Sequence, residues 1–478
     1  MDLSIYFTTS IKKKIIFFLN IIGFEKFIRD TTKKINILNG SHRGGGEMEA
    51  SEIIDCSQLC MVYRTCMNPF FQTSTPGEVD FMIENSESDR KIIGIDPALL
   101  LFCIAVAVAM FGEAMYVVYI PNFLSESEIS LGDIGIFYTV FFVINALVSI
   151  PAGYISDRVG RNILIFSLFV LGAVVFFYPF AETRAHLLLL RACHAIAHAF
   201  FFPVSRAYVM DKSTEENRGR AMGLYGVSLT VAGTVAVLIG GVIREITGSF
   251  DLLFHTAAIF PVAAAIFLIV VVRDLGRGFA VEKMAFPTRD LIRNKAFVVL
   301  LLMFALVFSV SGVMNIVVPL FAIEELGMSY TFLGALSMCV GIILVFSQYA
   351  VGVLSDKYGR KRLLVYPFII FAVGTFFAAA SANQWMFLAA YLLIGVGTAP
   401  LNTVAYSSVG DVVKQEQRGT ASGAANSASN GGEIFGPLIG SALGAALGLR
   451  APLFVCSGLV AAAVVLLVLM FPSRKASE

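Results

Sequence analysis

Apolar residues dominate the chain from residue 97 onward, where they form long continuous runs separated by short polar segments. Each run is close to the about 20 residues that an α-helix needs to cross the hydrocarbon core of a bilayer. Strands are excluded as the spanning elements, because a membrane β-barrel alternates apolar and polar positions along each strand. The pattern predicts an all-α membrane protein with twelve transmembrane helices, at residues 97–121, 131–155, 163–181, 187–209, 220–242, 253–273, 296–322, 331–354, 363–381, 385–409, 420–446 and 452–471.

Two polar segments far apart in the chain repeat the same pattern of residues. Residues 153–161 read Gly-Tyr-Ile-Ser-Asp-Arg-Val-Gly-Arg, and residues 352–360 read Gly-Val-Leu-Ser-Asp-Lys-Tyr-Gly-Arg. These copies are 199 residues apart, and further pairs such as Gly240 with Gly440 are 200 residues apart. A repeat of this length indicates a duplicated six-helix half, an arrangement typical of transporters that alternate access around a central site.

The repeat divides the chain into five parts. We expect an N-terminal cytoplasmic segment at 1–95, a six-helix bundle at 96–273, a cytoplasmic linker at 274–295, a second six-helix bundle at 296–471 and a cytoplasmic tail at 472–478. The first segment differs in composition from the bundles and contains no run long enough to span. It could be a basic amphipathic helix on the inner leaflet, a disordered segment, or sequence upstream of a true start at Met48 or Met82.

The charged residues are few, 14% against 57% apolar residues, and they are sorted between the two sides of the predicted membrane. If residue 97 begins on the cytoplasmic side, nearly all Lys and Arg of the connections lie there. The opposite side has only Arg184, Arg244 and Arg450. This asymmetry predicts a multi-pass protein of the plasma (inner cell) membrane with both termini in the cytoplasm. The net charge of +1 gives no reason to expect a nucleic-acid partner, and we expect a monomer.

The repeated segments place an acidic residue at the C-terminal end of a helix, where the helix dipole disfavours it. Asp157 therefore needs a positive partner, and we expect it to be the N-terminal end of the eleventh helix in the other half, at Gly419 to Gly423, with Arg418 beside it. By pseudo-symmetry Asp356 would face the start of the fifth helix, beside Arg218. The alternative is that the segments are merely two well-capped hairpins that obey the positive-inside rule.

Four glycines recur at equivalent places in the two segments. Gly160 and Gly359 permit the positive φ of a tight turn. Gly153 and Gly352 permit close approach of another helix.

At these segments the chain resembles the major facilitator superfamily, whose signature after helices two and eight is Gly-x-x-x-Asp-Arg/Lys-x-Gly-Arg-Arg/Lys. The second copy is complete, and the first departs only at its last position, where Asn162 replaces a basic residue. The resemblance covers about residues 97–471 and implies two six-helix domains that rock between inward-open and outward-open states around a central cavity. It also implies a cytoplasmic latch, in which we place Gly153, Asp157, Arg158, Gly160, Arg161, Asp211, Arg218, Gly352, Asp356, Lys357, Gly359, Arg360 and Arg418.

Few ionisable residues lie inside the predicted helices, where a charge is costly unless it faces a cavity or a partner. Glu113 and Arg191 fall at similar depths in the outer half of the membrane, so they are plausible neighbours. Arg191, with Pro203 twelve residues later, resembles the helix-four motif of the superfamily's proton-coupled exporters, although alanines stand where the family has glycines. Burial favours a neutral Glu113 and a neighbouring cation favours the carboxylate. Proton coupling, direct substrate contact and a structural pair all remain open for Glu113.

Other polar residues of the helices are candidates for the cavity or for coupling. Glu433 could be a second proton-coupling or cation-recognising carboxylate, or a structural residue shielded by Asn426 and Asn430. It precedes a Gly-Pro-x-x-Gly element that resembles the antiporter motif of helix five but lies in helix eleven. Two histidines one helical turn apart are either structural or cavity residues, and no further ligands point to a metal. The substrate-cavity candidates are His194, His198, Asn315, Asn402 and Asn430.

These features together predict a secondary active transporter without a cofactor, most simply a proton-coupled exporter of small organic or amphipathic compounds. Proton-coupled uptake of a metabolite is the alternative within transport, and a non-transporting membrane receptor is the alternative outside it. An enzyme is not expected, because the sequence shows no nucleophile and base at catalytic spacing.

Overall fold

The computed structural model describes residues 96–214, 217–272, 275–276, 291, 293–358, 360–399, 404–413 and 418–470, with backbone only at 348–353, 355–358 and 418–420. The expectations for residues 1–95, for most of the linker and for the tail lie outside the described residues, as do those for Gly359 and Asn402. Within the described residues all regular structure is helical and no strand occurs. The predicted all-α membrane fold is confirmed.

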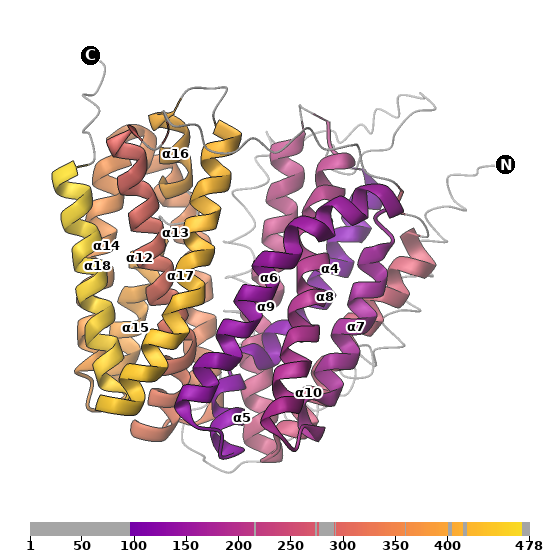
Figure 1. The fold of residues 1–478 in the computed structure, drawn as a ribbon, viewed down its shortest axis with the longest axis horizontal. Coiled ribbons are helices and arrows are strands. Elements are labelled where there is room, and N and C mark those ends of the chain that lie inside the picture. Colours follow the sequence, from indigo (N-terminus) through magenta and orange to yellow (C-terminus); the bar gives the residue numbers. More distant parts are fainter. Residues whose placement is uncertain are drawn as a thin grey trace, which may run out of the picture. The chain divides into compact units, whose positions relative to one another are not determined.

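The first half consists of helices that follow one another up and down, drawn from indigo to magenta in Figure 1. They are α4 (Pro97–Val117) and α5 (Ile120–Glu126), α6 (Leu131–Val159), α7 (Ile163–Phe177) with the short η3 (Tyr178–Phe180), α8 (Arg184–Asp211), α9 (Arg218–Thr247), and α10 (Phe250–Phe267) with η4 (Leu268–Val272).

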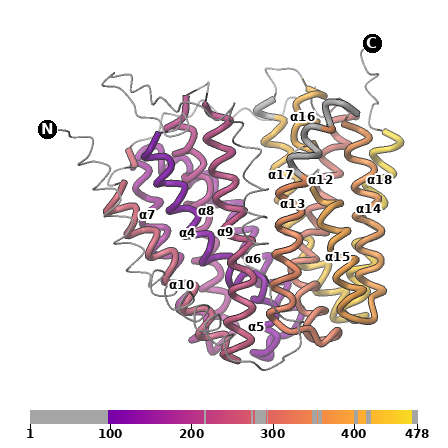
Figure 2. Tube along the Cα trace, turned by 180° about the vertical axis from the view of Figure 1, so that it is seen from behind, coloured from indigo at the N-terminus to yellow at the C-terminus, as the bar shows by residue number. Residues whose placement is uncertain are grey.

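The second half repeats this order, drawn from orange to yellow in Figures 1 and 2. Its helices are α12 (Lys295–Leu320) with η5 (Phe321–Glu325), α13 (Tyr330–Tyr358), α14 (Arg360–Ala379), α15 (Gln384–Thr398), α16 (Tyr406–Val412), α17 (Arg418–Leu447) and α18 (Arg450–Met470). All twelve predicted positions therefore carry a helix. Ten helices of the described residues are long and apolar enough to cross a membrane, and α15 is a shorter apolar helix.

The starts of the helices also repeat. The hydroxyl of Ser130 accepts the backbone N–H of Asp133 before α6, and Ser329 accepts that of Phe332 before α13, 199 residues later. Thr183 caps α8 and Asn383 caps α15, 200 residues apart. A side-chain oxygen at this position satisfies one of the N–H groups that the first turn leaves without a partner. The duplication thus fixes where corresponding helices begin, and not only the loops between them.

The two halves contact each other at the end of the bundle that contains α5, which is the predicted outer end. Tyr330, the first residue of α13, donates its hydroxyl to Glu126 of α5 at 2.6 Å, and its backbone N–H donates to Glu245 of α9 at 2.8 Å. Arg244 forms a bidentate pair with Glu126, at 2.8 Å to each oxygen. Nearby, Asn122 Nδ2 donates to the carbonyl of Pro319 at 3.1 Å.

The space around glycine residues differs between the two ends of the bundle. A Cβ built on Gly241 or Gly334, near the outer end, would be too close to atoms of the other half. A Cβ on Gly153, Gly219 or Gly423, at the predicted cytoplasmic end, would meet none of the described atoms within 4 Å. Among the described residues, the close helix approach that we predicted at Gly153 is therefore not made in this conformation, whereas the halves are packed at the predicted outer end.

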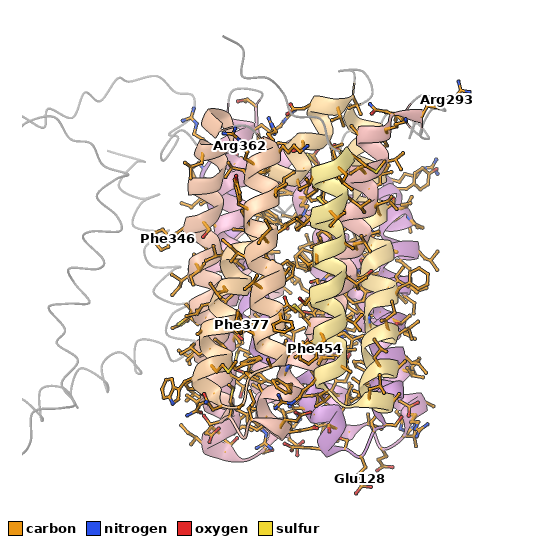
Figure 3. All side chains as sticks on the ribbon, turned by 90° about the vertical axis from the view of Figure 1, so that its left-hand side faces the viewer. Glu128, Arg293, Phe346, Arg362, Phe377 and Phe454 are labelled. Atoms are coloured by element: carbon orange, nitrogen blue, oxygen red, sulfur yellow. The ribbon has the colours of Figure 1, made fainter. Side chains whose placement is uncertain are left out.

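The surface of the helices is consistent with a lipid environment. Large apolar side chains such as Phe346, Phe377 and Phe454 are exposed along the sides of the bundle. Figure 3 shows them between the two ends, whereas Arg293 and Arg362 lie at one end and Glu128 lies at the other. An apolar belt bounded by charged ends is the pattern expected of a protein that spans a bilayer.

Candidate functional site

A buried polar cluster in the first half joins α4, α8 and η3. His194 is at its centre, with no solvent exposure, and its Nε2 lies 3.1 Å from Oε1 of Glu113. Its Nδ1 lies 3.3 Å from Nη1 of Arg191 and 3.1 Å from the hydroxyl of Tyr178. The hydroxyl of Tyr116 is 3.4 Å from Nε2. Glu113 and Arg191, which the sequence suggested as neighbours, thus lie on opposite sides of one imidazole.

The neighbours of His194 define its protonation. A guanidinium can only donate hydrogen bonds, so Nδ1 facing Arg191 must be the acceptor. The proton of a neutral imidazole is then on Nε2, from which it is donated to the carboxylate of Glu113. With a neutral imidazole, the cation Arg191 and the anion Glu113 balance each other, so the cluster has no formal net charge inside the membrane. Balanced charge is the condition under which such groups are tolerated there.

Helix periodicity explains why these side chains meet. On α8, Arg191, His194 and His198 are spaced by three and four residues and therefore share one face. On α4, Glu113 and Tyr116 are three residues apart and share the face that meets them. The alanines that stand at the family's glycine positions, Ala195, Ala197 and Ala199, are all fully or almost fully buried, so α8 packs closely without glycine.

The guanidinium of Arg191 is surrounded by aromatic rings of α6. Its Cζ lies 4.1 Å from the ring centroid of Phe141, 4.6 Å from that of Phe137 and 5.1 Å from that of Tyr138. The side chain is 2% exposed, so these cation–π contacts replace part of the hydration that it lost on burial. The sequence analysis did not foresee this cage, although the three aromatic residues lie on one face of a predicted helix.

Several buried polar atoms of the cluster have no hydrogen-bond partner within the described residues. They are Oε2 of Glu113, Nε of Arg191 and the hydroxyl of Tyr138. Each such atom is costly to bury, and a free carboxylate oxygen is a ready acceptor for a proton. Glu113 therefore has one oxygen held by His194 and a second available for chemistry.

One turn further along α8, His198 is half-buried and is held by a residue of α6. Its Nδ1 lies 2.9 Å from Nδ2 of Asn145, and Ser149 donates to the backbone carbonyl of Asn145 at 2.6 Å. Its ring centroid is 6.5 Å from that of His194. The sequence analysis missed Asn145, because an uncharged polar residue in a transmembrane helix gives no signal until its neighbours are known.

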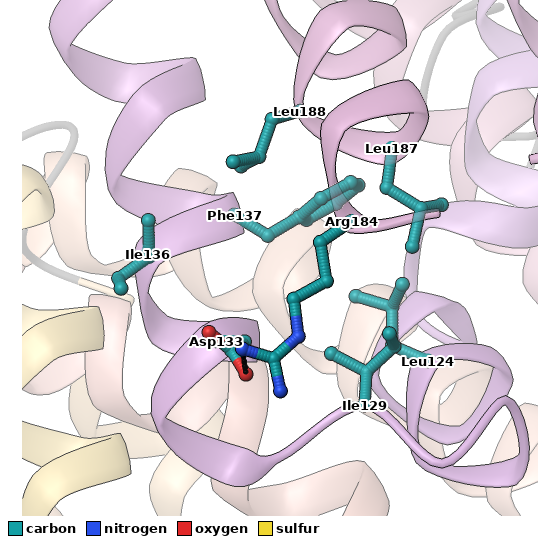
Figure 4. A pocket seen from close by; sticks show the side chains of 8 residues that line it. All are labelled: Leu124, Ile129, Asp133, Ile136, Phe137, Arg184, Leu187 and Leu188. Carbon is teal, nitrogen blue, oxygen red and sulfur yellow. Dashed lines mark ion pairs between the residues drawn. The ribbon is translucent and has the colours of Figure 1, made fainter. Parts of the chain in front are cut away.

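Figure 4 shows a small pocket beside the cluster, at the predicted outer end of α6 and α8. At its mouth Arg184 pairs with Asp133 at 3.0 Å. Phe137, whose ring also contacts Arg191, lines the pocket. The remaining lining residues are apolar: Leu124, Ile129, Ile136, Leu187 and Leu188. The ring of Phe137 therefore lies between the pocket and the buried guanidinium of Arg191.

The first repeated loop forms an ion network around Arg161, which is 3% exposed. Arg161 contacts Asp157 at 2.7 Å, Asp211 at 2.9 Å and the hydroxyl of Ser156 at 2.6 Å. Asp157 thus has a cation within its own segment. The side chain of Arg418 lies outside the described residues, so the expected contact between the halves remains a prediction.

The turn itself has the predicted geometry. Gly160 has φ 111°, a value that residues with a Cβ rarely adopt, which confirms the positive φ expected there. It brings Arg161 back over the end of α6, and the backbone N–H of Arg161 donates to the carbonyl of Gly276 at 2.9 Å. Arg158 points elsewhere and stacks on the ring of Tyr154 at 4.3 Å.

The second loop repeats part of this network. Arg360 pairs with Asp411 at 2.5 Å, and the two residues correspond to Arg161 and Asp211 at spacings of 199 and 200. Sequence analysis placed Asp211 in the latch but missed Asp411, although the repeat spacing alone would have found it. The side chains of Asp356 and Lys357 lie outside the described residues.

The polar residues that were predicted in the second half and lie in the described part of the chain are not gathered into a cluster. Glu433 is half-buried and has no hydrogen bond or ion pair within the part of the chain that the structure describes. Asn430 is half-buried, whereas Asn426 and Asn315 are exposed. His194, which we expected on the cavity wall, is instead fully buried.

Comparisons with known proteins agree with the fold. The sequence model of the Major Facilitator Superfamily matches residues 102–347 and 300–478. An uncharacterised MFS-type transporter of Methanocaldococcus jannaschii is 23% identical over 61% of this chain and 76% of its own length. The multi-drug resistance efflux pump PmrA of Streptococcus pneumoniae is 27% identical over 60% of this chain and 74% of its own.

Solved structures of other proteins share this fold. A bacterial homologue of the human lysosomal transporter Spinster superposes with a TM-score of 0.68 at 18% identity, over 78% of this chain and 95% of that chain. The nucleoside transporter NupG gives a TM-score of 0.65 at 12% identity, over 79% of this chain and 100% of that chain. From the family match over most of its length, the chain belongs to the major facilitator superfamily and is a secondary transporter.

Proposed function

We propose that this transporter exports small organic or amphipathic compounds in exchange for protons, and that Glu113 carries the proton. The observation that supports this most is the carboxylate of Glu113, 8% exposed, with one oxygen bound to His194 and the other without a partner within the described residues. A buried carboxylate that can change charge is the group such coupling requires.

Arg191 acts as the switch of this site. While Glu113 is ionised, its charge balances that of Arg191 across His194. When Glu113 binds a proton, the caged guanidinium keeps its charge and loses its counter-ion, so the energy of the buried cluster changes. A conformational change that moves the cluster towards water would relieve that imbalance. Proton binding is thereby linked to the exchange between conformations.

The direction of transport and the class of substrate rest on the relatives. Several are named as multidrug resistance proteins or efflux pumps, from Bacillus subtilis, Proteus mirabilis and Streptococcus pneumoniae. Glu433, half-buried and without a described partner on α17, serves in this proposal as a second carboxylate that recognises a cationic group or a second proton. The cavity candidates Asn315 and Asn430 lie on the same half.

The charged loops serve as the cytoplasmic latch, and the protein works as a monomer in the plasma membrane with both termini in the cytoplasm. The networks around Arg161 and Arg360 rigidify the two loops that would meet when the cytoplasmic end closes. Among the described residues a Cβ on Gly153 would meet no neighbour, which supports the view that this end is open in the conformation described here.

Flux measurements on purified protein in proteoliposomes test this function. We would impose a pH gradient of either sign and screen labelled organic cations, neutral amphipaths and small metabolites. The proposal expects substrate to accumulate in the compartment from which protons leave, and expects a protonophore to abolish this. Flux that does not depend on the pH gradient would refute proton coupling. Saturable substrate binding without flux would support a receptor instead.

A further inference from the structure

The proposed function leaves open how a proton reaches a carboxylate as deeply buried as Glu113. Between Glu113 and the predicted outer end of the bundle, the space is filled by aromatic side chains. Tyr116 and Tyr178 are 1% exposed, and both rings pack on Phe254, at centroid distances of 5.3 and 5.5 Å. Phe123 also packs on Phe254, at a centroid distance of 4.8 Å. Such a dense layer excludes water, so in this conformation Glu113 does not exchange protons with the outer side.

Towards the other end the surroundings are polar. Chain direction places His198 one turn beyond His194 along α8, and Ser149 one turn beyond Asn145 along α6, both in the direction of the predicted cytoplasmic end. His198, Asn145 and Ser149 are all half-buried, in contrast to the fully buried His194. The exposed fraction thus rises from the fully buried His194 to the half-buried residues of the seam between α6 and α8.

We propose that His198, held by Asn145, is the entry and exit point through which the proton of Glu113 exchanges with the open end of the bundle. The inference rests on the proposed role of Glu113 and adds the route. The ring separation of 6.5 Å between His198 and His194 is one that a single water molecule can bridge. His194 in turn lies 3.1 Å from the carboxylate.

The transfer moves one proton and breaks no other covalent bond, although the hydrogen bond from Arg191 to Nδ1 of His194 is lost. Solvent protonates His198 to an imidazolium, which passes a proton through the bridging water to Nδ1 of His194. His194 releases its Nε2 proton to Glu113, which becomes a neutral acid, and both imidazoles end uncharged. Tyr178, 3.1 Å from Nδ1, can turn its hydroxyl from donor to acceptor to hold the new tautomer. The reverse transfer restores the first tautomer.

His198 lies among ionisable groups of both signs. The ionisable groups near it are Glu113 on α4 and Arg191, His194 and Arg206 on α8. From α6 it meets only neutral groups, with the amide of Asn145 at 2.9 Å. An amide can present its nitrogen to a bare Nδ1 or its oxygen to a protonated one, so Asn145 can follow either charge state. Phe141 and Phe202 flank the ring at 5.0 and 4.3 Å, which limits access by water to one edge.

The test measures the rate of proton exchange after a pH jump, with full-length protein in detergent and with a pH-sensitive dye in the medium. In His198→Ala we expect the slow proton uptake assigned to Glu113 to keep its amplitude and to lose at least about tenfold in rate. Added imidazole should restore the rate, because it replaces the missing carrier. Asn145→Leu should slow the uptake less and should not respond to imidazole.

His255→Ala is the matched control, because His255 is a half-buried histidine of the same half whose ring packs on Phe176 and Phe180. It should exchange protons like the unaltered protein, with or without imidazole. An unchanged rate in His198→Ala would overturn the proposed route, as would a lowered rate that imidazole does not rescue. Glu113→Gln separates the two proposals: if it retains the slow uptake, Glu113 is not the carrier and the proposed function itself fails.

Discussion

The two halves of the bundle share a fold but not a charge distribution. In α8 and α15, which begin at caps 200 residues apart, Arg191 and His194 correspond to Tyr391 and Ile394. For α4 and α12 the correspondence follows from two equivalent glycines: Gly240 contacts Met115 of α4, and Gly440 contacts Val313 of α12. Residues of α4 and α12 therefore correspond at a spacing of 198. The residue that corresponds to Glu113 is then Ser311.

The second half therefore builds the same helices without a buried ionic cluster. Ile394 is 4% exposed and belongs to an apolar core, and Tyr391 stacks on Phe387 at 5.6 Å. Since this half folds with uncharged residues at these positions, the fold does not require the charges of the first half. Charges in a membrane are costly, so a buried ionic cluster at these positions of the first half, and not at the corresponding positions of the second, is best explained by work that it does there.

Exchanging the residues of one half for those of the other tests this comparison most strongly. We expect the triple variant Glu113→Ser, Arg191→Tyr, His194→Ile to insert and to be at least as stable to heat as the unaltered protein, because replacing a complete buried ion group by uncharged residues is often neutral or stabilising. Gradient-driven flux should fall to background. Thermal unfolding and flux are both measured; normal flux would show that the cluster is structural.

Removing the charge of Arg191 alone should lower both the stability of the protein and its transport activity. We expect Arg191→Leu to lose about 100-fold in gradient-driven flux and also to unfold at a lower temperature, because Glu113 then lacks its counter-charge, at a cost of about 3–5 kcal/mol. Arg191→Lys keeps the charge but cannot spread it over three rings, so it should recover part of both. A lysine variant no better than leucine would mean that the cage, and not the charge, is what matters.

The repeated loops offer a milder comparison between the halves. Asp157→Asn and Gly153→Val should reduce transport about tenfold by weakening the latch, with little loss of folded protein, because a Cβ at Gly153 meets no atom in the open conformation. The equivalent changes Asp356→Asn and Gly352→Val should cost less, as the family resemblance suggests. Flux and the yield of folded protein are compared for all four. Equal or reversed severity would show that the two loops are equivalent.

The smallest effect is expected at the contacts that close the outer end. Tyr330→Phe removes the hydrogen bond to Glu126 but keeps the ring between Arg244 and Phe250. One such bond contributes about 1 kcal/mol, so the population of outward-open molecules should rise about fivefold. Labelling of a cysteine placed at Asn122 reports that population. Labelling unchanged from the parent would place the closing energy in the other contacts.

The fold could be predicted from the sequence because membrane helices are determined by local apolar length. The sequence repeat predicted that the two halves correspond, and its spacing of 200 residues would also have identified Asp411 as the equivalent of Asp211. The ion network around Arg161 was only partly predicted, because the sequence does not show that a positive φ at Gly160 directs Arg161 back onto Asp157.

The candidate site was predicted less completely than the fold. Glu113 and Arg191 were found because charges in apolar helices are rare. The position of His194 between Glu113 and Arg191 could not be predicted, because it depends on how α4 and α8 are rotated relative to each other. For the same reason Asn145 was missed and His194 was assigned to the cavity wall.

The central claim is that Glu113 couples proton movement to transport, and one comparison of two fluxes tests it directly. In proteoliposomes, Glu113→Gln should lose pH-gradient-driven accumulation while it retains energy-independent exchange of labelled for unlabelled substrate, because the amide mimics only the protonated state. Ser311→Ala, at the corresponding place in the second half, is the control and should retain both. A Glu113→Gln protein that still concentrates substrate with a pH gradient would contradict the account.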